Sequence, residues 1–350
     1  MLISDLPQEL LDLIIDYVAE LKDWYGPVRS LRSCSYVARA WWPRCRAHLH
    51  HTFECLEGMT ARKSAFIDDP SLCDLVRTLI VKLNGNHTWI KSNARRVGPE
   101  DVMVMLKRMR GITHLSITSL ALFRRETQEY EWLLEPVYFS RVVTLHPLVH
   151  LTLRNVAFRR FDEFTEIIGR FPVLEELVLV AIRPSYNSIL DKTAYSTENS
   201  LAPPAKLKSL WFEPDAPSSV DFAEALGLWI KASRETVKIE TVTFDVQAID
   251  VLCNRRSNAT GLEANGCILA HFAASGYLRT IRLYIGSAPQ GLGERAHVLD
   301  RCLESGSFAS LQGLHLLAVR SDSQEIIELM PQLSKRLGGR ITVGGGKDWL

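Results

Sequence analysis

The sequence predicts an α+β protein in which a short helical segment at the N-terminus precedes an α/β array of repeats. Two patterns support this class: apolar residues recur at helical spacing over about the first 50 residues, and a strand-like pattern recurs eight times after residue 70. The composition is that of a folded chain, because 47% of the 350 residues are hydrophobic and 23% are charged. This length suits about two domains or one extended repeat array.

The composition also argues against several classes of protein. A protein that coats nucleic acid needs a basic excess, whereas this chain has 41 Lys+Arg and 40 Asp+Glu. No apolar run approaches the roughly 18 residues that span a bilayer, and the N-terminus is too acidic for a targeting peptide. Seven cysteines without a CxxC pair indicate buried thiols in a reducing compartment. We therefore expect a cytoplasmic or nuclear protein that binds neither nucleic acid nor membrane.

The first 50 or so residues predict three helices. Over residues 6–21 the apolar side chains recur every three or four positions, at Leu6, Leu10, Leu13, Ile14, Tyr17, Val18 and Leu21. Pro7 suits the first helical turn, and Gly26-Pro27 ends the segment. A second helix is expected from about Ser30, and a short third helix follows Pro43 to about Phe53.

The first of these helices carries more apolar surface than a small module can bury. Leu11 and Ile15 lie beside the main stripe, so more than half of the helix circumference is apolar. Because three helices in about 50 residues cannot enclose all of this surface, we expect the first helix to bind a partner. The charges are segregated too: residues 1–23 carry six acids and one base, and residues 24–51 carry five bases and no acid. We interpret this as charge complementarity between packed helices.

Several motifs of this segment occur together. The sequence opens with Leu6-Pro7-Gln8-Glu9-Leu10-Leu11, followed by Ile14-Ile15, Ser30-Leu31-Arg32 and Val37-Ala38-Arg39-Ala40-Trp41. The combination resembles the F-box family over about one seventh of the chain, although the 19–28 connection is longer than is typical. The resemblance implies docking on a Skp-family adaptor through Leu6, Pro7, Leu10, Leu13, Ile14, Leu31, Val37 and Trp41. Some of these residues must instead hold the three helices together, and the sequence does not divide the set.

After residue 70, the pattern hydrophobic-x-x-hydrophobic-x-hydrophobic recurs with its middle positions 26 to 39 residues apart. The eight occurrences are Val76-Leu79-Val81, Ile112-Leu115-Ile117, Leu148-Leu151-Leu153, Leu174-Leu177-Leu179, Leu207-Leu210-Phe212, Ile239-Val242-Phe244, Leu278-Ile281-Leu283 and Leu311-Leu314-Leu316. Helix-like stretches lie between them at 99–110, 161–171, 220–232, 262–274, 294–303 and 324–337. Each repeat is therefore expected to form a strand, a turn, a helix and a return loop, and 341–343 a last short strand.

These repeats resemble an irregular leucine-rich-repeat array. The expected architecture is a three-helix F-box-like module (1–55), a linker (56–75), an α/β leucine-rich-repeat-like solenoid (76–343) and a flexible tail (344–350). A doubly wound βαβ sheet would show the same alternation, but no strand is followed by a glycine-rich phosphate loop. Insertions at 84–98, 123–143 and 184–206 interrupt the array, and the second of them is expected to hold a helix near 129–136.

The motifs contain no catalytic constellation, so we expect no enzymatic activity, no cofactor and no metal. Gly344-Gly-Gly-Lys347 departs from a phosphate loop, because Ile341 replaces the first glycine and Asp348 replaces the Ser/Thr. The remaining candidates lack the spacing of zinc ligands; they are His48, His50 and His51 with Cys45 and Cys55.

A surface remains as the candidate for function. Residues between the core positions of each strand face the other side of the sheet, where they could contact a target protein. The candidate contacts are His114, His150, Arg154, Glu176, Trp211, Arg282 and Tyr284. Tryptophan and arginine are enriched at binding hot spots. Equally, Trp211 could pack beneath the 184–206 insertion, and the sequence leaves both possibilities open.

The F-box resemblance implies a substrate-recognition subunit of an SCF-type (cullin–RING) ubiquitin ligase. The module would dock on the Skp-family adaptor and through it on a cullin, and the array would hold an unidentified target near the ubiquitin-conjugating enzyme. One alternative is a leucine-rich-repeat scaffold unrelated to ubiquitination, whose N-terminal helices cap the array and bury the Leu10/Ile14 face against residues 70–85. Another is an α/β enzyme, which would need a pocket of titratable side chains at the carboxyl ends of the strands.

Overall fold

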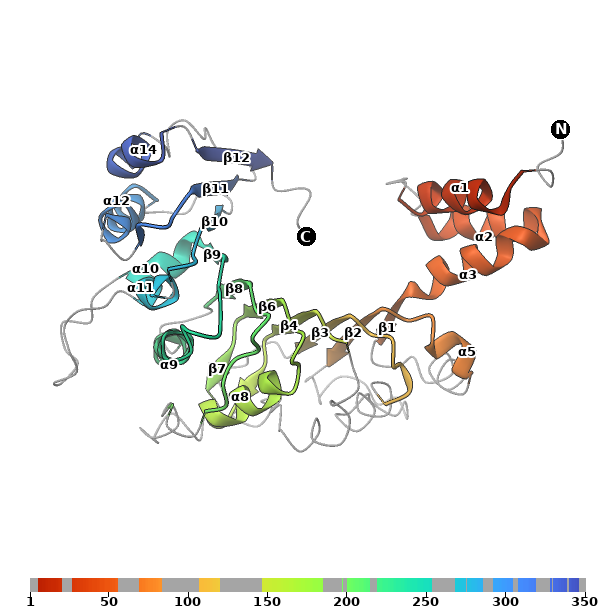
Figure 1. Cartoon of the computed structure of the whole chain (residues 1–350), viewed down its shortest axis with the longest axis horizontal. Coiled ribbons are helices and arrows are strands. Elements are labelled where there is room, and N and C mark those ends of the chain that lie inside the picture. Colours follow the sequence, from red (N-terminus) through yellow and green to blue (C-terminus); the bar gives the residue numbers. More distant parts are fainter. Residues whose placement is uncertain are drawn as a thin grey trace, which may run out of the picture. The chain divides into compact units, whose positions relative to one another are not determined.

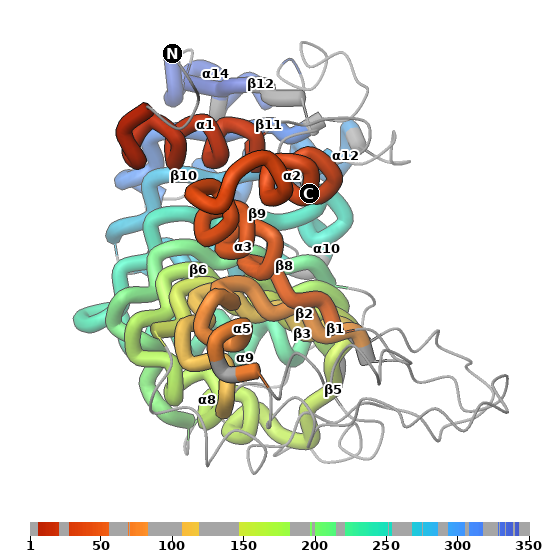
Figure 2. Tube along the Cα trace, turned by 90° about the vertical axis from the view of Figure 1, so that its right-hand side faces the viewer, coloured from red at the N-terminus to blue at the C-terminus, as the bar shows by residue number. Residues whose placement is uncertain are grey.

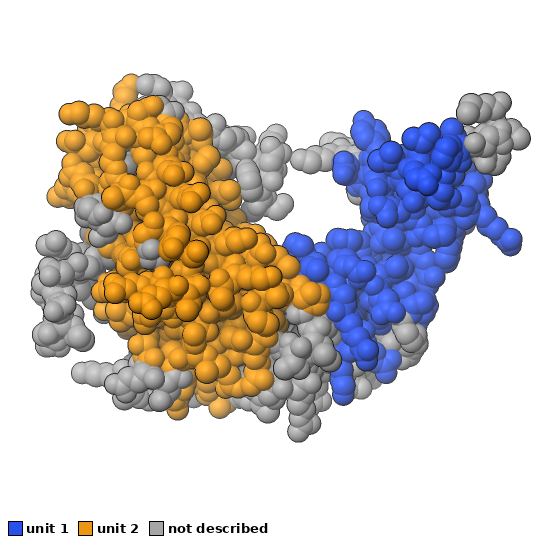
Figure 3. Space-filling view, viewed as in Figure 1, with its two compact units in different colours: residues 1–82, 92–115 blue, residues 83–91, 116–350 orange. Residues whose placement is uncertain are grey.

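The computed structural model describes residues 6–20, 27–55, 69–83, 107–119, 147–184, 197, 200–214, 219–253, 268–274, 276–285, 292–304, 308–318, 328, 330–338 and 340–345. This part of the chain mixes helices and strands, and ten of its strands form a sheet in the order β1-β2-β3-β4-β6-β8-β9-β10-β11-β12 (Figure 1). The expected α+β class is thereby confirmed. Two compact units result, described separately below: residues 1–82 with 92–115, and residues 83–91 with 116–350 (Figure 3).

The first unit begins with the three expected helices. Its elements are α1 (Gln8–Glu20), α2 (Pro27–Val37), the 3-10 turn η2 (Arg39–Trp41), α3 (Trp42–His51), β1 (Thr52–Cys55) and α5 (Pro70–Cys73), with β2 (Thr78–Leu83) following. Helix α2 starts at Pro27, three residues before the expected start, because proline is well tolerated in a first turn. The expectation that the third helix continues to Phe53 is wrong: 52–55 form β1, which pairs in parallel with β2. Thr52 and Phe53 are residues that favour strands, which explains why the chain forms a strand here and not a further helical turn.

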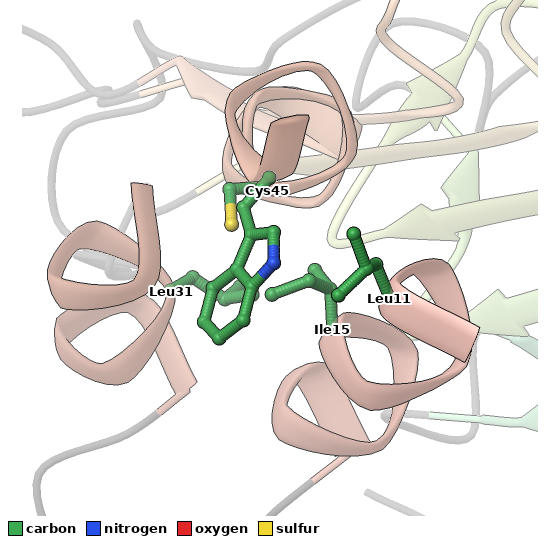
Figure 4. Close-up of a cluster of buried hydrophobic side chains, with 5 residues drawn as sticks. Leu11, Ile15, Leu31 and Cys45 are labelled. Carbon is green, nitrogen blue, oxygen red and sulfur yellow. The ribbon is translucent and has the colours of Figure 1, made fainter. Parts of the chain in front are cut away.

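The helical module has a closed core of its own. Leu11 and Ile15 from α1, Leu31 from α2 and Cys45 from α3 point toward one another (Figure 4), and the buried Trp41 completes the cluster. Partly buried side chains pack around it; they are Leu6, Val18, Ala19, Cys34, Ala38 and Leu49. The two α1 residues that are fully part of this core, Leu11 and Ile15, are therefore those expected to lie beside the main stripe of the first helix.

An ion-pair network ties α1 to α3. Arg44 donates from Nε to Asp16 Oδ1 at 2.6 Å and from Nη2 to Oδ2 at 2.7 Å, and His48 Nε2 donates to Oδ1 at 2.7 Å. The hydrogen bonds from Arg44 and His48 lower the pKa of Asp16 from 3.8 to about 2. One acid of the N-terminal acidic stretch thus pairs with bases of the following basic stretch, in line with the expected complementarity.

Replacing Asp16 by asparagine is expected to destabilise the module in a pH-dependent way. The pKa of Asp16 is lower in the folded state, so its stabilising contribution is full above about pH 4 and is lost as the pH falls toward 2. Because Arg44 is 42% exposed, solvent screening limits the loss at pH 7 to about 1 kcal/mol. Urea unfolding followed by circular dichroism should show this difference at pH 7 and only a small remainder of it near pH 2, where the carboxyl is about half protonated in the folded state. A difference that stays constant across this range would contradict the assignment.

The strands follow one another in chain order (Figure 2). They are β3 (His114–Ser119), β4 (His150–Arg154), β6 (Glu176–Val180), β8 (Ser209–Glu213), β9 (Thr241–Asp245), β10 (Thr280–Ile285), β11 (Gly313–Ala318) and β12 (Ile341–Gly345). Every junction from β4 to β12 is parallel and aligns equivalent positions of successive repeats. All eight repeats and the last short strand are confirmed as strands, and all 24 pattern positions are buried. Strand β12 extends through Gly345, so the expectation that the flexible tail begins at residue 344 is wrong.

In the second unit the helices lie on one side of the strands (Figure 1). They are α8 (Phe161–Gly169), α9 (Ser219–Ala232), α10 (Ile249–Cys253), α11 (Ile268–Ala273), α12 (Leu292–Leu303) and α14 (Pro331–Leu337). Phe212 of β8 stacks on Phe222 of α9 with ring centroids 6.3 Å apart, which fixes the face of the strand that meets the helices. No helix in the described ranges is long and apolar enough to cross a membrane.

Most expected helices of the array are confirmed where the structure describes them. Helix α8 lies within 161–171, α9 and α12 begin one and two residues before 220–232 and 294–303, and α11 and α14 lie within 262–274 and 324–337. Only the last residues of 99–110 fall in the described part. The insertions at 84–98 and 123–143, with the expected helix near 129–136, lie outside it, as does most of 184–206. The 3-10 turn η6 (Val246–Ala248) and α10 were not expected.

Two neighbouring strands end in the same unusual backbone conformation. Asn155 after β4 and Ala181 after β6 have positive φ angles of 55° and 52°. The amide of Asn155 donates to the carbonyl of Val180 at 2.9 Å, and that of Ala181 to the carbonyl of Glu213 at 2.7 Å. Each turn leads into a short strand, and these form a second parallel pair, β5 (Ala157–Phe158) with β7 (Arg183–Pro184). The repeats at β4 and β6 therefore share one turn geometry.

Substitutions at Ala181 should reveal this backbone strain. A left-handed conformation costs a residue with a side chain about 1–2 kcal/mol, and a β-branched side chain is the least tolerant. Ala181→Val is expected to lower the melting temperature measured by circular dichroism, whereas Ala181→Gly should leave it unchanged or raise it. Equal effects of the two substitutions would contradict the left-handed assignment.

Candidate interaction surfaces

Helix α1 has a second apolar stripe that points away from the core of the module. Leu10, Leu13, Ile14 and Tyr17 occupy positions i, i+3, i+4 and i+7, the spacing of one helix face. Leu13 is 62% exposed and Ile14 is 41% exposed. By contrast, Leu11 and Ile15, which belong to the other apolar face of the helix, are buried. A row of four exposed large apolar side chains on one helix is typical of a protein-binding surface.

Exposed apolar and aromatic side chains continue on α2 and at the start of α3. Tyr36 is 89% exposed, and Val28, Val37 and Trp42 are also exposed. The guanidinium of Arg46 lies over the Trp42 ring, 4.9 Å from its centroid. We call the α1 stripe together with these side chains the module surface. It consists of Leu10, Leu13, Ile14, Tyr17, Val28, Tyr36, Val37 and Trp42.

The structure divides the residues that the F-box resemblance implies as adaptor contacts. Five of the eight are exposed, namely Pro7, Leu10, Leu13, Ile14 and Val37. Leu6 is half-buried against the core, and Leu31 and Trp41 are part of the core itself. The exposed Val28, Tyr36 and Trp42 were missed because they lie outside the motif. Tyr17 was recognised as part of the stripe but not as a contact.

In the second unit, strand register gathers polar and aromatic side chains on the face opposite the helices, which we call the strand face. Its first row is His150, Glu176, Ser209, Thr241, Thr280 and Gly313. The second row is Thr152, Val178, Trp211, Thr243, Arg282, His315 and Thr342. The third row includes Arg154, Val180 and Glu213 on adjacent strands, and Asp245 opposite Tyr284. Six of the seven expected target contacts thus share this face, and the seventh, His114, begins β3.

The histidines of the strand face are engaged in local interactions. His150 lies 2.9 Å from Glu176 Oε2 through Nδ1 and 3.1 Å from Thr152 Oγ1 through Nε2. His315 Nδ1 lies 2.6 Å from Thr342 Oγ1. Burial and the nearby Arg282 lower the pKa of His315. These contacts join neighbouring strands, since His150 of β4 meets Glu176 of β6 and His315 of β11 meets Thr342 of β12.

Trp211 packs on strand β6. Its ring lies against Val178, Val180 and Ala181, which are all buried. The indole Nε1 is buried and lacks a hydrogen-bond partner in the part of the chain that the structure describes. Residues 185–196 of the insertion lie outside this part, so the possibility that Trp211 packs beneath them stays a prediction.

Two acidic side chains, Glu213 and Asp245, lie at the ends of β8 and β9, where they extend the strand face. Burial raises the pKa of Glu213, and the charge of Asp245 raises it further, whereas Arg154 lowers it. Burial also raises the pKa of Asp245, whose Oδ1 accepts a hydrogen bond from the Gln247 amide at 2.6 Å. The sequence signal for Asp245 is its position before the short 246–248 turn, where aspartate is a favoured cap.

No cluster of three or more His, Cys, Asp and Glu in the described ranges could hold a metal ion. His48 pairs with Asp16, and burial is the main reason why the pKa values of His50 and His51 are lowered. Gly344 and Gly345 of the glycine-rich segment belong to β12, and residues 346–350 lie outside the described part.

The sequence was also compared with known proteins. No protein-family model matches it, and no curated protein matches it at a significant level.

Proposed function

We propose that this chain is a substrate-recognition subunit of an SCF-type ubiquitin ligase. The F-box-like module docks on a Skp-family adaptor, which connects it to a cullin, and the leucine-rich-repeat-like solenoid binds a target protein. The chain supplies proximity and its partners supply catalysis, in the cytoplasm or the nucleus.

One observation carries this proposal: the module buries one apolar stripe of α1 in a closed core and leaves a second one exposed. A helix that only stabilised its own module would place polar side chains at Leu10, Leu13 and Ile14. Four exposed large apolar residues at helical spacing provide an anchor of the kind that dominates protein interfaces.

The same exposure argues against the alternative in which the N-terminal helices cap the array. A cap would bury Leu10 and Ile14 against residues 70–85. Instead, both side chains are more than 40% exposed, at 46% and 41%. The described part of the chain favours a docking surface over a cap.

Affinity purification of the tagged full-length chain from cells that also express a Skp-family adaptor and a cullin tests the proposal. Both partners are expected in the eluate in amounts comparable to the chain. Leu228→Asp is a matched control, because Leu228 on α9 is an exposed leucine of the second unit and its substitution should leave this recovery unchanged. Recovery of the folded chain with neither partner would overturn the proposal.

A further inference from the structure

Strand β6 is apolar on both faces of the sheet, unlike its neighbours. Leu177 and Leu179 face the helices, and Val178 and Val180 lie on the strand face with only 6% of their surface exposed. In β4 and β8, by contrast, buried and partly exposed residues alternate. Parallel strands with apolar residues on both faces are typical of sheets that are covered on both sides. In the described part of the second unit, helices cover one side only.

Trp211 of β8 extends this apolar area across the strand face. Register places it opposite Val178, and its ring packs against Val178, Val180 and Ala181. We call these four residues the Trp211 patch. The buried Nε1 atom has no partner in the described ranges, and the contacts that hold the ring there are apolar. Trp211 covers Val178, Val180 and Ala181, which are only 6–7% exposed, so its own partly exposed ring is the apolar surface that the patch offers.

An acidic pair borders the patch. Glu213 follows Trp211 by two residues on the same face of β8, and Asp245 is the next residue after Phe244, which pairs with Phe212. The two carboxyl groups are therefore at neighbouring positions, and each has its pKa raised chiefly by burial. The charge of Arg295 lowers the pKa of Asp245, but this guanidinium is already paired with Asp250 at 2.8 Å.

The attraction of Arg154 offsets the burial of Glu213 only in part, because burial still raises the pKa of this carboxyl. Asp245 accepts the Gln247 amide, but no hydrogen bond or ion pair to the Glu213 carboxylate occurs within the described part of the chain. Arg154, which attracts Glu213, is not in ion-pair contact with it there. A half-buried carboxylate next to a second one is a position that a cation would stabilise.

We propose that the strand face at β6, β8 and β9 binds a basic, apolar segment of the target protein. An aliphatic or aromatic side chain of the target packs on the exposed part of the Trp211 ring, and an adjacent lysine or arginine pairs with Glu213 and Asp245. This inference rests on the proposed function in that it names the chemistry of the target.

Charge complementarity selects this occupant over others. A lysine or arginine beside Glu213 gains charge-assisted hydrogen bonds and can lie over the Trp211 ring. An acidic or phosphorylated segment would meet two carboxylates of like charge, which costs affinity. A purely apolar segment would bury the carboxylates further without giving them a partner.

Selection from a random peptide library displayed on phage, with the full-length chain as bait, tests the inference. Peptides enriched by the wild-type chain are expected to share a lysine or arginine within two residues of a large apolar residue. Their affinity should fall at least about tenfold for the Glu213→Gln/Asp245→Asn double variant, because charged hydrogen bonds are lost. Trp211→Ala should produce a comparable loss. Both acid substitutions preserve shape, and asparagine keeps the cap at residue 245, so the variants should fold.

Glu224→Gln is the matched control, since Glu224 is an exposed carboxylate on α9, and it should leave the affinity unchanged. Enrichment of acidic or uncharged peptides, basic peptides that bind the double variant equally well, or no enrichment above background would each overturn the inference. Adaptor binding measured on the same wild-type preparation separates this result from the proposed function. A chain that selects basic peptides but does not bind the adaptor contradicts only the proposed function.

Discussion

Aspartate at both Leu13 and Ile14 is expected to abolish binding of the Skp-family adaptor while the helical module stays folded. The two side chains are 62% and 41% exposed, so charged replacements meet water in the free chain and cost little stability. In the complex they would be buried in an apolar interface, where each lost anchor costs about 2 kcal/mol or more. The affinity for the adaptor, measured by calorimetric titration, should therefore fall at least about a hundredfold.

Leu228→Asp again serves as the control, because it places the same charge on an exposed leucine outside the module. It should bind the adaptor as the wild type does. Unchanged affinity of the Leu13→Asp/Ile14→Asp variant would mean that the α1 stripe is not the docking surface.

Ile15→Ala is expected to unfold the module, in contrast to a substitution of its neighbour Ile14. Ile15 is fully buried in the small core with Leu11, Leu31, Trp41 and Cys45. Shortening a buried isoleucine to alanine costs about 2–5 kcal/mol, which is a large fraction of the stability of a module of this size. Hydrogen exchange of the α1 to α3 amides should lose its protection.

The pair Ile14→Ala and Ile15→Ala separates loss of contact from loss of fold. Ile14→Ala should keep the exchange protection and weaken adaptor binding, and Ile15→Ala should lose both. If the exchange protection of the amides survives Ile15→Ala, or is lost in Ile14→Ala, then the assignment of Ile15 to the buried face of α1 and of Ile14 to its exposed face is contradicted.

The repeat pattern predicted the sheet well because it records burial directly. All three positions of each repeat are buried, and even the most exposed of them, Leu311 just before β11, is only 5% exposed. The first position precedes the strand in each case, yet it packs as tightly as the two positions within it. Parallel register then follows, since equivalent residues of successive repeats align.

The orientation of α1 could not be predicted from the sequence. The strongest apolar stripe suggested one face, but Leu11 and Ile15 beside it are the residues that α2 and α3 cover. When a helix is apolar over more than half of its circumference, periodicity shows that two faces exist and not which one is buried. The partners of the helix decide this, since Leu11 and Ile15 pack in one core with Leu31, Trp41 and Cys45.

The strand pattern places the two acids on the strand face, but their neighbouring positions and their burial follow only from the structure. Glu213 and Asp245 are 32 residues apart in the chain, and only the pairing of β8 with β9 brings them to neighbouring positions. The apolar patch beside them did leave a signal, since β6 reads Glu-Leu-Val-Leu-Val without the alternation of β4 and β8. Short elements such as η6 and α10 fall below the length at which periodicity can be recognised.

The central claim is that the module presents an apolar surface for a foreign subunit. Size-exclusion chromatography with light scattering, on the purified full-length chain mixed with a purified Skp-family adaptor at about 10 μM each, tests it most directly. The expected result is a single species with the mass of a 1:1 complex for the wild type, and separate elution for Leu13→Asp/Ile14→Asp. Separate elution of the wild-type chain from the adaptor, with its helices folded by circular dichroism, would contradict the claim.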